Sequence, residues 1–437
     1  MKGKTTLALH HKIFLGMLLG IAGGVAIKYI GADEAFISNV TAVVKPIGDI
    51  FLRMIFMMVI PLIVTALILG ISDLGDLKKI GRIGLRTLIY TIVVSGISVF
   101  IGVGMVKIFR PGQGISESDR AYLTEQFKEK SKDMPSNVAD ISSGNIGTIL
   151  TNIVPKNPIE DMSRAFDPTY KGGGLLSVMF FSLILGLALS AADPDKTEPV
   201  RKFLEGFYEM LMKAIGFGMK FAPYGVAALL FVMTANTGLS LLSVVLKYVL
   251  VVLAALAIHQ FITYSLLIRI VGKMSPAFFF KGIQEVMLTA FSTSSSNATL
   301  PTAIRVTTEK LRIPRDITNF VLTIGSSATQ NGTALYEGIT VLFIAQVFGV
   351  ELTLGQQLFV VMIAIFAGMG TAGVPGGSLP VIMMILVSIG VPGEGIALIY
   401  GVDRILDMSR TVLNVTGDIT AAVCISRFET RNPKPSL

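Results

Sequence analysis

Long apolar runs decide the environment in which this chain can fold. Crossing the hydrocarbon core of a bilayer takes about 20 residues of α-helix, and five runs in the sequence are long enough to do so. Hydrophobic residues make up 52% of the 437 positions and charged residues only 15%, which excludes an ordinary soluble domain. We therefore predict an all-α polytopic membrane protein whose outer surface contacts the lipid bilayer. The five runs lie at about 13–30, 40–71, 86–108, 203–233 and 241–270.

The distribution of cations predicts the orientation of these spans. Lysines and arginines cluster at 78–86 and at 427–434, in short polar segments beside apolar runs. Such segments stay in the cytoplasm, so both termini are expected on the cytoplasmic side of a cell membrane, either a plasma or an inner membrane. The same bias accounts for the net charge of +8, so we expect no nucleic-acid partner. The single cysteine, Cys424, excludes an internal disulfide and a paired-thiol metal site.

The last apolar stretch, at about 395–425, carries ionisable side chains at membrane depth. A charged side chain at the centre of a bilayer costs about 2.5–3.5 kcal/mol, so these side chains must face a protein-lined cavity rather than lipid. We interpret them as a binding site for a zwitterionic or anionic ligand, and a purely structural ladder of ion pairs is the alternative. Five polar positions lie within roughly 80° of one helical stripe: Asp403, Asp407, Arg410, Asn414 and Asp418.

Three polar interruptions break the apolar sequence after residue 272. They lie at 290–301, 325–338 and 368–380, and each has apolar flanks. Irregular backbone at membrane depth is tolerated only where it is buried in protein or lines a watery cavity. We predict that the first and third are tips of re-entrant helical hairpins and that the second is an unwound helix. Paired broken segments of this kind point to the ligand site of an inverted-repeat transporter. Two extracellular loops are the alternative for the first and third.

Glu337 follows the middle interruption on the resumed helix. Burial disfavours the ionised form of a carboxyl group, which makes Glu337 a candidate proton carrier unless an arginine keeps it charged. A structural ion pair with Arg404 or Arg410 is the alternative. Arg404 and Asp403 are expected to compensate charge around the site. The serines at 294–296 have no histidine nearby to act as a base, so we expect no enzymatic activity.

Four motifs follow one another along the second half of the chain: Ser294-Ser-Ser-Asn-Ala-Thr-Leu-Pro301, Asn331-Gly-Thr-Ala-Leu-Tyr336, Gly370-Thr-Ala-Gly-Val-Pro-Gly376 and the stretch from Asp403 to Asp418. In this order they resemble the dicarboxylate/amino acid:cation symporter family, which includes archaeal aspartate transporters and vertebrate excitatory amino acid transporters. The likeness runs over nearly the whole chain. It implies eight transmembrane helices plus two re-entrant hairpins, built as inverted repeats, in a homotrimer whose transport domains move like elevators.

The resemblance also implies a division of the chain into a scaffold and a transport domain. Residues 1–71 would form the first two scaffold helices, and 72–109 the third helix, which belongs to the transport domain. Residues 110–238 would form an extracellular insertion and two further scaffold helices. The rest of the transport domain would follow at 239–426, with a cytoplasmic tail at 427–437.

By motif position, the resemblance assigns roles around an acidic amino acid as substrate. Arg410 would bind the side-chain carboxylate and Asp407 the amino group, which suits a guanidinium fork and a buried acid. Relatives that carry neutral amino acids lack the arginine, and C4-dicarboxylate carriers lack the acid, so this chain is expected to carry glutamate or aspartate. The remaining polar shell would comprise Asn414, Thr411, Ser296 and Thr333, with backbone at Val374 and Gly376 closing over the substrate as a gate.

Departures from the family pattern bear on the coupling ion. Sodium-coupled relatives have an acid where this chain has Asn331, and they have a hydroxyl where it has Val94. Since a dehydrated cation needs several oxygens, this sodium site looks dismantled. Eukaryotic members that move protons have glutamate at the place of Glu337. We therefore expect coupling to protons or to no cation, and no cofactor; a sodium symporter with a rearranged site and an anion channel stay open. Candidate cation ligands are Asp418, Asn331, Thr329, Thr371 and Asn414.

Overall fold

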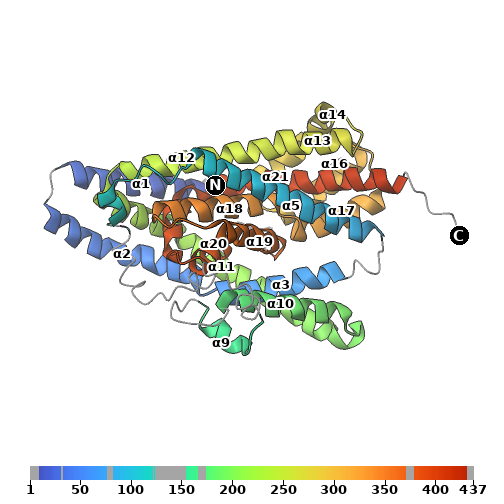
Figure 1. Cartoon of the computed structure of the whole chain (residues 1–437), viewed down its shortest axis with the longest axis horizontal. Helices are drawn as coiled ribbons and strands as arrows, with labels where there is room; N and C mark the ends of the chain where they lie inside the picture. Colours follow the sequence, from blue (N-terminus) through green and yellow to red (C-terminus); the bar gives the residue numbers. More distant parts are fainter. Residues whose placement is uncertain are drawn as a thin grey trace, which may run out of the picture.

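The computed structural model describes residues 9–30, 33–75, 82–121, 123, 154–165, 174–370 and 378–430, and every regular element in these ranges is a helix. This agrees with the all-α prediction (Figure 1). Within the described ranges, five helices are long and apolar enough to cross a membrane: His11–Tyr29, Ala35–Met54, Ile83–Phe109, Pro194–Thr237 and Leu241–Ile270.

One predicted span differs from the structure. The apolar run at 40–71 is not a single helix, because α2 (Glu34–Phe56) ends and α3 (Val59–Gly75) begins after a two-residue turn. Hydropathy alone could not locate this break, since both sides of the turn are apolar. α3 packs along α10 (Gly174–Ala191), where Gly186 lies directly against Ile68 and Ile71.

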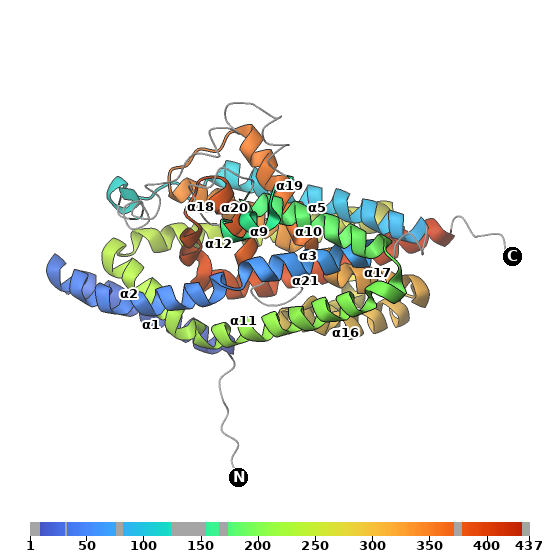
Figure 2. The same ribbon diagram turned by 90° about the horizontal axis from the view of Figure 1, so that it is seen from below.

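The first helix packs very closely against a later one. α1 (Leu9–Tyr29) runs along α11 (Pro194–Thr237), and α2 contacts the same helix. Gly16 and Gly20 lie so close to α11 that a Cβ atom would overlap the backbone of Pro223 or Ala227. Small residues of this kind let helix backbones approach in a membrane, where hydrophobic driving force between helices is missing. Figure 2 shows α11 along one side of the molecule and α19 (Leu354–Gly370) along the other, with α21 (Ala397–Thr430) between them.

The most deeply buried helix is α18 (Asn331–Val347), on which nearly every side chain is buried. It packs against α5 (Arg82–Phe109) and against α21 (Ala397–Thr430). The Tyr248 hydroxyl on α12 (Ser240–Ile258) lies 2.7 Å from the Thr340 hydroxyl, and its ring stacks on Phe343 with centroids 4.4 Å apart. α12 continues through the π-helical turn η1 (His259–Thr263) into α13 (Tyr264–Ile270), and α14 (Pro276–Gly282) follows.

The polar interruptions coincide with breaks between helices. α15 (Gln284–Thr293) and α16 (Ser296–Glu309) contact each other across a turn in which Ser294 adopts a left-handed φ of 51°. Thr329 and Gln330 separate α17 (Arg315–Ala328) from α18. Leu354–Gly370 precedes the third interruption and α20 (Leu379–Ser388) follows it. Its tip, with the candidate residues Thr371, Val374 and Gly376, lies outside the described residues.

Short helices complete the description. α9 (Pro158–Ser163) starts from an Asn157 cap, and the 3-10 turn η2 (Gly393–Ile396) leads into α21. Most of the polar segment predicted as an extracellular insertion, at about 110–145, lies outside the described residues.

Candidate functional site

The polar stripe predicted on the last helix lies inside the protein. Its five members are between 2% and 6% exposed, so none faces lipid. They lie on α21, which contacts α18, α12, α5 and the first hairpin. The insertion penalty for charged groups is therefore avoided by burial against other protein groups, as the sequence predicts. The stripe comprises Asp403, Asp407, Arg410, Asn414 and Asp418.

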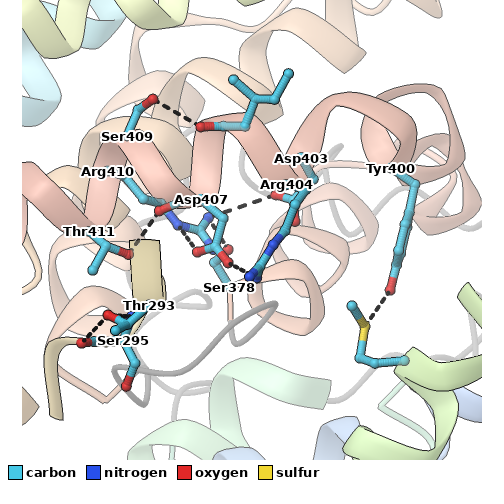
Figure 3. Close-up of polar contacts among 12 residues, drawn as sticks. Thr293, Ser295, Ser378, Tyr400, Asp403, Arg404, Asp407, Ser409, Arg410 and Thr411 are labelled. Atoms are coloured by element: carbon cyan, nitrogen blue, oxygen red, sulfur yellow. Dashed lines mark hydrogen bonds and ion pairs between the residues drawn. The ribbon is translucent and has the colours of Figure 1, made fainter. Parts of the chain in front are cut away.

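Arg410 is held by an acid one turn away on its own helix. Its Nε and Nη2 atoms donate to the same oxygen, Asp407 Oδ1, at 3.0 and 2.7 Å. Its Nη1 atom donates to Ser378 Oγ and lies 4.0 Å from Asp403 Oδ1, as Figure 3 shows. The guanidinium carbon also lies 4.6 Å from the centroid of the Tyr336 ring, a cation–π contact. The guanidinium is thus fixed by two acids, a hydroxyl and an aromatic face.

Asp407 keeps one oxygen available. Its Oδ2 atom is buried and has no hydrogen-bond partner among the described residues, while Arg404 Nη1 lies 3.5 Å away. Arg404 is the more exposed of the two arginines, with 21% of its side chain accessible. Asp403 accepts a 2.6 Å hydrogen bond from the Tyr336 hydroxyl. Asp407 Oδ2 thus has an ion-pair partner in Arg404 but no hydrogen bond, so it can still accept one from an incoming ammonium group.

A network of neutral groups adjoins the arginine. Asn414 Oδ1 accepts from the backbone N–H of Gly332 at 2.7 Å, and its Nδ2 donates to Gln330 Oε1 at 2.5 Å and to Thr333 Oγ1 at 3.1 Å. Thr333 donates to Gln330 Oε1 at 3.2 Å. The break between α17 and α18 thereby brings the predicted residues Asn414 and Thr333 together. Thr411 was also predicted as a substrate-binding residue, and its hydroxyl donates a hydrogen bond to the backbone carbonyl of Asp407 at 2.8 Å.

The tip of the first hairpin approaches the same helix. α15 and α16 both contact α21, and Figure 3 shows Thr293 and Ser295 of the tip on the side of α21 that carries Thr411. Ser294 and Ser296 are 1% and 2% exposed, and neither hydroxyl has a hydrogen-bond partner among the described residues. Since a buried hydroxyl normally has a partner, these two are available to a bound molecule.

The candidate cation ligands are partly occupied by protein partners. Asn331 Oδ1 accepts from Ser95 Oγ at 2.6 Å, and its Nδ2 donates to the Tyr264 hydroxyl at 3.2 Å. Thr329 and Thr91 share a 3.0 Å hydrogen bond. Asp418 differs from these groups, because its Oδ1 atom is buried and has no hydrogen-bond partner in the described part of the chain.

Glu337 is isolated in the interior. It is 0% exposed, and neither of its carboxyl oxygens has a hydrogen-bond partner among the described residues. The ion pair considered from the sequence, with Arg404 or Arg410, does not form, since both arginines pair with Asp407 instead. Arg410 still influences Glu337 through the electrostatic field. A carboxyl group with no donor in a dry interior is far less costly in its protonated form.

Two contacts of the site were not predicted. Ser378 and Gln330 both bind side chains of the stripe, Ser378 through Arg410 and Gln330 through Asn414. Each lies within a polar interruption that the sequence indicates, at 368–380 and 325–338. The sequence could have indicated these two residues only through their position in polar interruptions. Which residues of each interruption turn toward α21 is shown only by the packing of the helices.

The chain is similar to known membrane transporters over nearly its whole length. Residues 9–428 match the model of the sodium:dicarboxylate symporter family. It is 35% identical to a proton/sodium-glutamate symport protein of Bacillus caldotenax, covering 97% of this chain and 95% of the relative. It is also 35% identical to a proton/glutamate-aspartate symporter of Escherichia coli, covering 97% and 93%. A C4-dicarboxylate transport protein of Anaeromyxobacter is 29% identical over 97% of this chain and 90% of the relative.

Proposed function

The chain belongs to the sodium:dicarboxylate symporter family, and from that premise we propose that it is a secondary active transporter of glutamate and aspartate. The observation that carries the proposal is the buried pair of Arg410 and Asp407, in which one guanidinium lies beside a carboxylate whose second oxygen accepts no hydrogen bond from the described residues. An acidic amino acid offers the matching charges, a carboxylate and an ammonium group. The relatives named as glutamate or glutamate-aspartate symporters support the same substrate class.

Binding proceeds in this proposal as an exchange of ion pairs. In the structure, Arg410 donates two hydrogen bonds to one oxygen of Asp407. The substrate side-chain carboxylate replaces Asp407 as the acceptor of the guanidinium fork, and the substrate ammonium group binds Asp407. Charge-assisted hydrogen bonds of this kind are worth about 1.5–3 kcal/mol each. Because each buried charge regains a partner, the exchange avoids the penalty of leaving a charge unpaired.

The neutral groups around the arginine orient the rest of the substrate. Asn414 and Thr333 supply an amide and a hydroxyl, and Thr411 and the unpartnered hydroxyl of Ser296 lie on the hairpin side. The second hairpin would close over the substrate with backbone groups at 374 and 376. Asp407 is also the feature that favours an amino acid over a C4-dicarboxylate, which has no ammonium group to pair with it.

Transport in this proposal moves the binding helices as a unit, in the manner of an elevator, within a homotrimer. The proposed topology has eight transmembrane helices and two re-entrant hairpins. The close packing of α1 and α2 on α11 supports a rigid scaffold. α5, α18, α21 and the first hairpin pack mainly on one another, which supports a separate moving part. The proposed boundaries are those of the sequence: scaffold at 1–71 and 110–238, transport domain at 72–109 and 239–426.

Proton coupling is the proposed source of free energy. The buried parts of α18 and α21 hold four carboxyl groups and one guanidinium group, with Arg404 half-buried beside them. Even if both arginines are counted, full ionisation would leave two negative charges uncompensated in the interior. Glu337 has no donor and no ion pair in the described part of the chain, so it is the group best placed to take up a proton. The protein groups that satisfy Asn331 leave little room for a sodium ion at that amide.

Sodium coupling is the second candidate, and one observation favours it. The buried Oδ1 atom of Asp418 has no partner among the described residues and could bind a cation. Relatives named as proton/sodium-glutamate symport proteins are consistent with such a site.

Uptake into proteoliposomes separates these possibilities. Labelled glutamate and aspartate are offered with a pH gradient, a sodium gradient or a potassium gradient imposed separately. We expect accumulation with an inward proton gradient in sodium-free choline buffer. Accumulation of labelled substrate only with an inward sodium gradient would refute proton coupling and support sodium coupling instead. Sustained single-channel currents without substrate accumulation would refute the transporter in favour of an anion channel.

A further inference from the structure

A groove of about 320 Å³ lies outside the substrate site, between α12 with η1, α15 and α21. Its walls include Ala257 from α12, Met287 and Phe291 from α15, and Val412 and Leu413 from α21. The lining is almost entirely apolar; Gln260 and Ser409 are the polar residues in it. Val412 and Leu413 lie on α21 next to Thr411 and Asn414, so the groove and the candidate substrate site share that helix.

The groove opens to the outer surface of the protein. Two residues of its rim, Phe261 and Leu288, are 55% and 69% exposed. Phe261 belongs to the segment Leu241–Ile270, which is long and apolar enough to cross a membrane. A hydrocarbon chain can fill an apolar groove at this depth, whereas water cannot satisfy its hydrogen bonds there.

Three cations lie on the segment that follows η1, formed by α13 and α14, and α14 contacts the groove helix α15. Arg269 is in the last turn of α13, Lys281 is in the last turn of α14, and Lys273 lies between these helices. All three are exposed, and none makes an ion pair with another described residue. The rings of Phe280 and Phe261 have centroids 5.5 Å apart, which places α14 against the rim of the groove. Figure 1 shows α12, α13 and α14 in succession along one edge of the molecule.

The nearest acid on the adjoining helix is already neutralised. Glu285, at the start of α15, accepts hydrogen bonds from Lys310 at 3.2 Å and from Arg305. The hydrogen bond from Lys310 and the charge of Arg305 hold the pKa of Glu285 below its usual value. Its charge is therefore offset by two other cations, which leaves the three unpaired cations to attract an anion.

The spacing of cations and groove matches the layers of a bilayer leaflet. Arg269 follows Phe261 by eight residues, or roughly 12 Å along a helix at 1.5 Å per residue. One leaflet contributes about 15 Å of hydrocarbon, half of the core. Arg269 then lies at the depth of lipid headgroups while Phe261, on the rim of the groove, lies at the depth of acyl chains.

We propose that the groove and the cations Arg269, Lys273 and Lys281 form a binding site for one anionic phospholipid. The phosphate lies among the cations and one acyl chain lies between α12, α15 and α21. The acyl chain of the lipid contacts α15, which is one arm of the first hairpin. It also contacts the face of α21 that adjoins the candidate substrate residues. Bound lipid therefore restrains the position of this hairpin relative to α21. The binding itself does not depend on the proposed transport function.

The absence of tryptophan from the sequence allows a direct test. Leu288→Trp places a fluorophore on the rim of the groove, and Leu250→Trp places one on an α12 position that is 59% exposed and does not line the groove. The purified full-length variants in detergent are titrated with phosphatidylglycerol or phosphatidylcholine brominated in the acyl chains. We expect saturable quenching at Leu288→Trp, with phosphatidylglycerol effective at a concentration at least about tenfold lower than phosphatidylcholine, and a preference that weakens with salt.

A second variant separates the headgroup contribution from general lipid contact. Replacing Arg269, Lys273 and Lys281 by glutamine in the Leu288→Trp protein should abolish the preference for phosphatidylglycerol while quenching by both lipids remains. The fluorescence readout does not depend on glutamate uptake. A failure of the proposed transport function can therefore be distinguished from a failure of the proposed lipid site. Equal quenching by both lipids at Leu288→Trp and Leu250→Trp would overturn the proposal. So would a preference that survives the glutamine substitutions, or no quenching at Leu288→Trp because a second copy covers the groove.

Discussion

Replacement of Arg410 is the sharpest test of how this protein selects its substrate. The guanidinium is 3% exposed and donates hydrogen bonds to Asp407 at 2.7 and 3.0 Å. If it transfers these bonds to the substrate carboxylate, removing it deletes one partner of a buried, hydrogen-bonded charge pair. Such deletions cost about 2–5 kcal/mol, or roughly 30- to 4,000-fold in affinity at 1.4 kcal/mol per factor of ten.

The expected loss lies within the lower half of this range. Arg410 pairs with Asp407 in this structure, so binding exchanges one carboxylate for another and gains less than a new ion pair would. We expect Arg410→Cys to weaken glutamate and aspartate binding by roughly 30- to 300-fold. The ammonium group of a neutral amino acid can still bind Asp407, so the affinity for a neutral amino acid should fall much less. The preference for glutamate over neutral amino acids should therefore decrease.

The assay is equilibrium binding of glutamate, aspartate and serine to the purified protein, with thermal unfolding measured in parallel. Arg410→Cys leaves Asp407 without its main partner, and breaking a buried pair destabilises a protein by about 3–5 kcal/mol. Arg410→Lys therefore accompanies it, because lysine keeps the charge but cannot present a planar fork. We expect a folded protein whose glutamate affinity falls at least about tenfold.

Arg404→Cys is the matched control. It removes an arginine from the same helix that is 21% exposed and lies 3.5 Å from Asp407 Oδ2, so glutamate affinity should change only a few-fold. Glutamate affinity within threefold of the parent in both Arg410 variants would refute the role given to the guanidinium, as would an equal loss in Arg404→Cys.

Three further predictions concern coupling and packing. Glu337→Gln should leave glutamate exchange intact but abolish accumulation driven by a pH gradient in proteoliposomes, because the neutral amide cannot carry a proton; unchanged accumulation would remove Glu337 from the coupling mechanism. Asn331→Asp combined with Val94→Thr should make uptake rise with external sodium, since an acid and a hydroxyl return to the altered site; uptake indifferent to sodium would contradict that account. Gly20→Ala should overpack the contact with α11, reduce the free energy of unfolding by about 1–3 kcal/mol and so lower the midpoint of thermal unfolding. Gly96, which has open space around it, is the control, and Gly96→Ala should leave stability equal or higher. Equal midpoints for the two variants would argue against the close helix contact.

The sequence by itself determined the class of the protein and the face of its most important helix. Spans follow from run length because a bilayer has a fixed thickness. The stripe from Asp403 to Asp418 follows from the 3.6-residue period, and its burial follows from the penalty for charge in lipid. Breaks at 290–301 and 325–338 could be located because polar residues at membrane depth require irregular backbone, and helices do end there.

Only the tertiary structure decided which polar groups pair. The sequence left Glu337 with two possible arginine partners, and packing assigned both arginines to Asp407 and none to Glu337. It also selected Ser378 and Gln330 as partners of Arg410 and Asn414, although each came from a segment with several equivalent candidates. The helical period specifies the direction in which a side chain points around the axis of its own helix. The distance between atoms on two helices depends on how those helices pack against each other. For that reason neither the helix break inside 40–71 nor the apolar groove between α12, α15 and α21 could be predicted from the sequence.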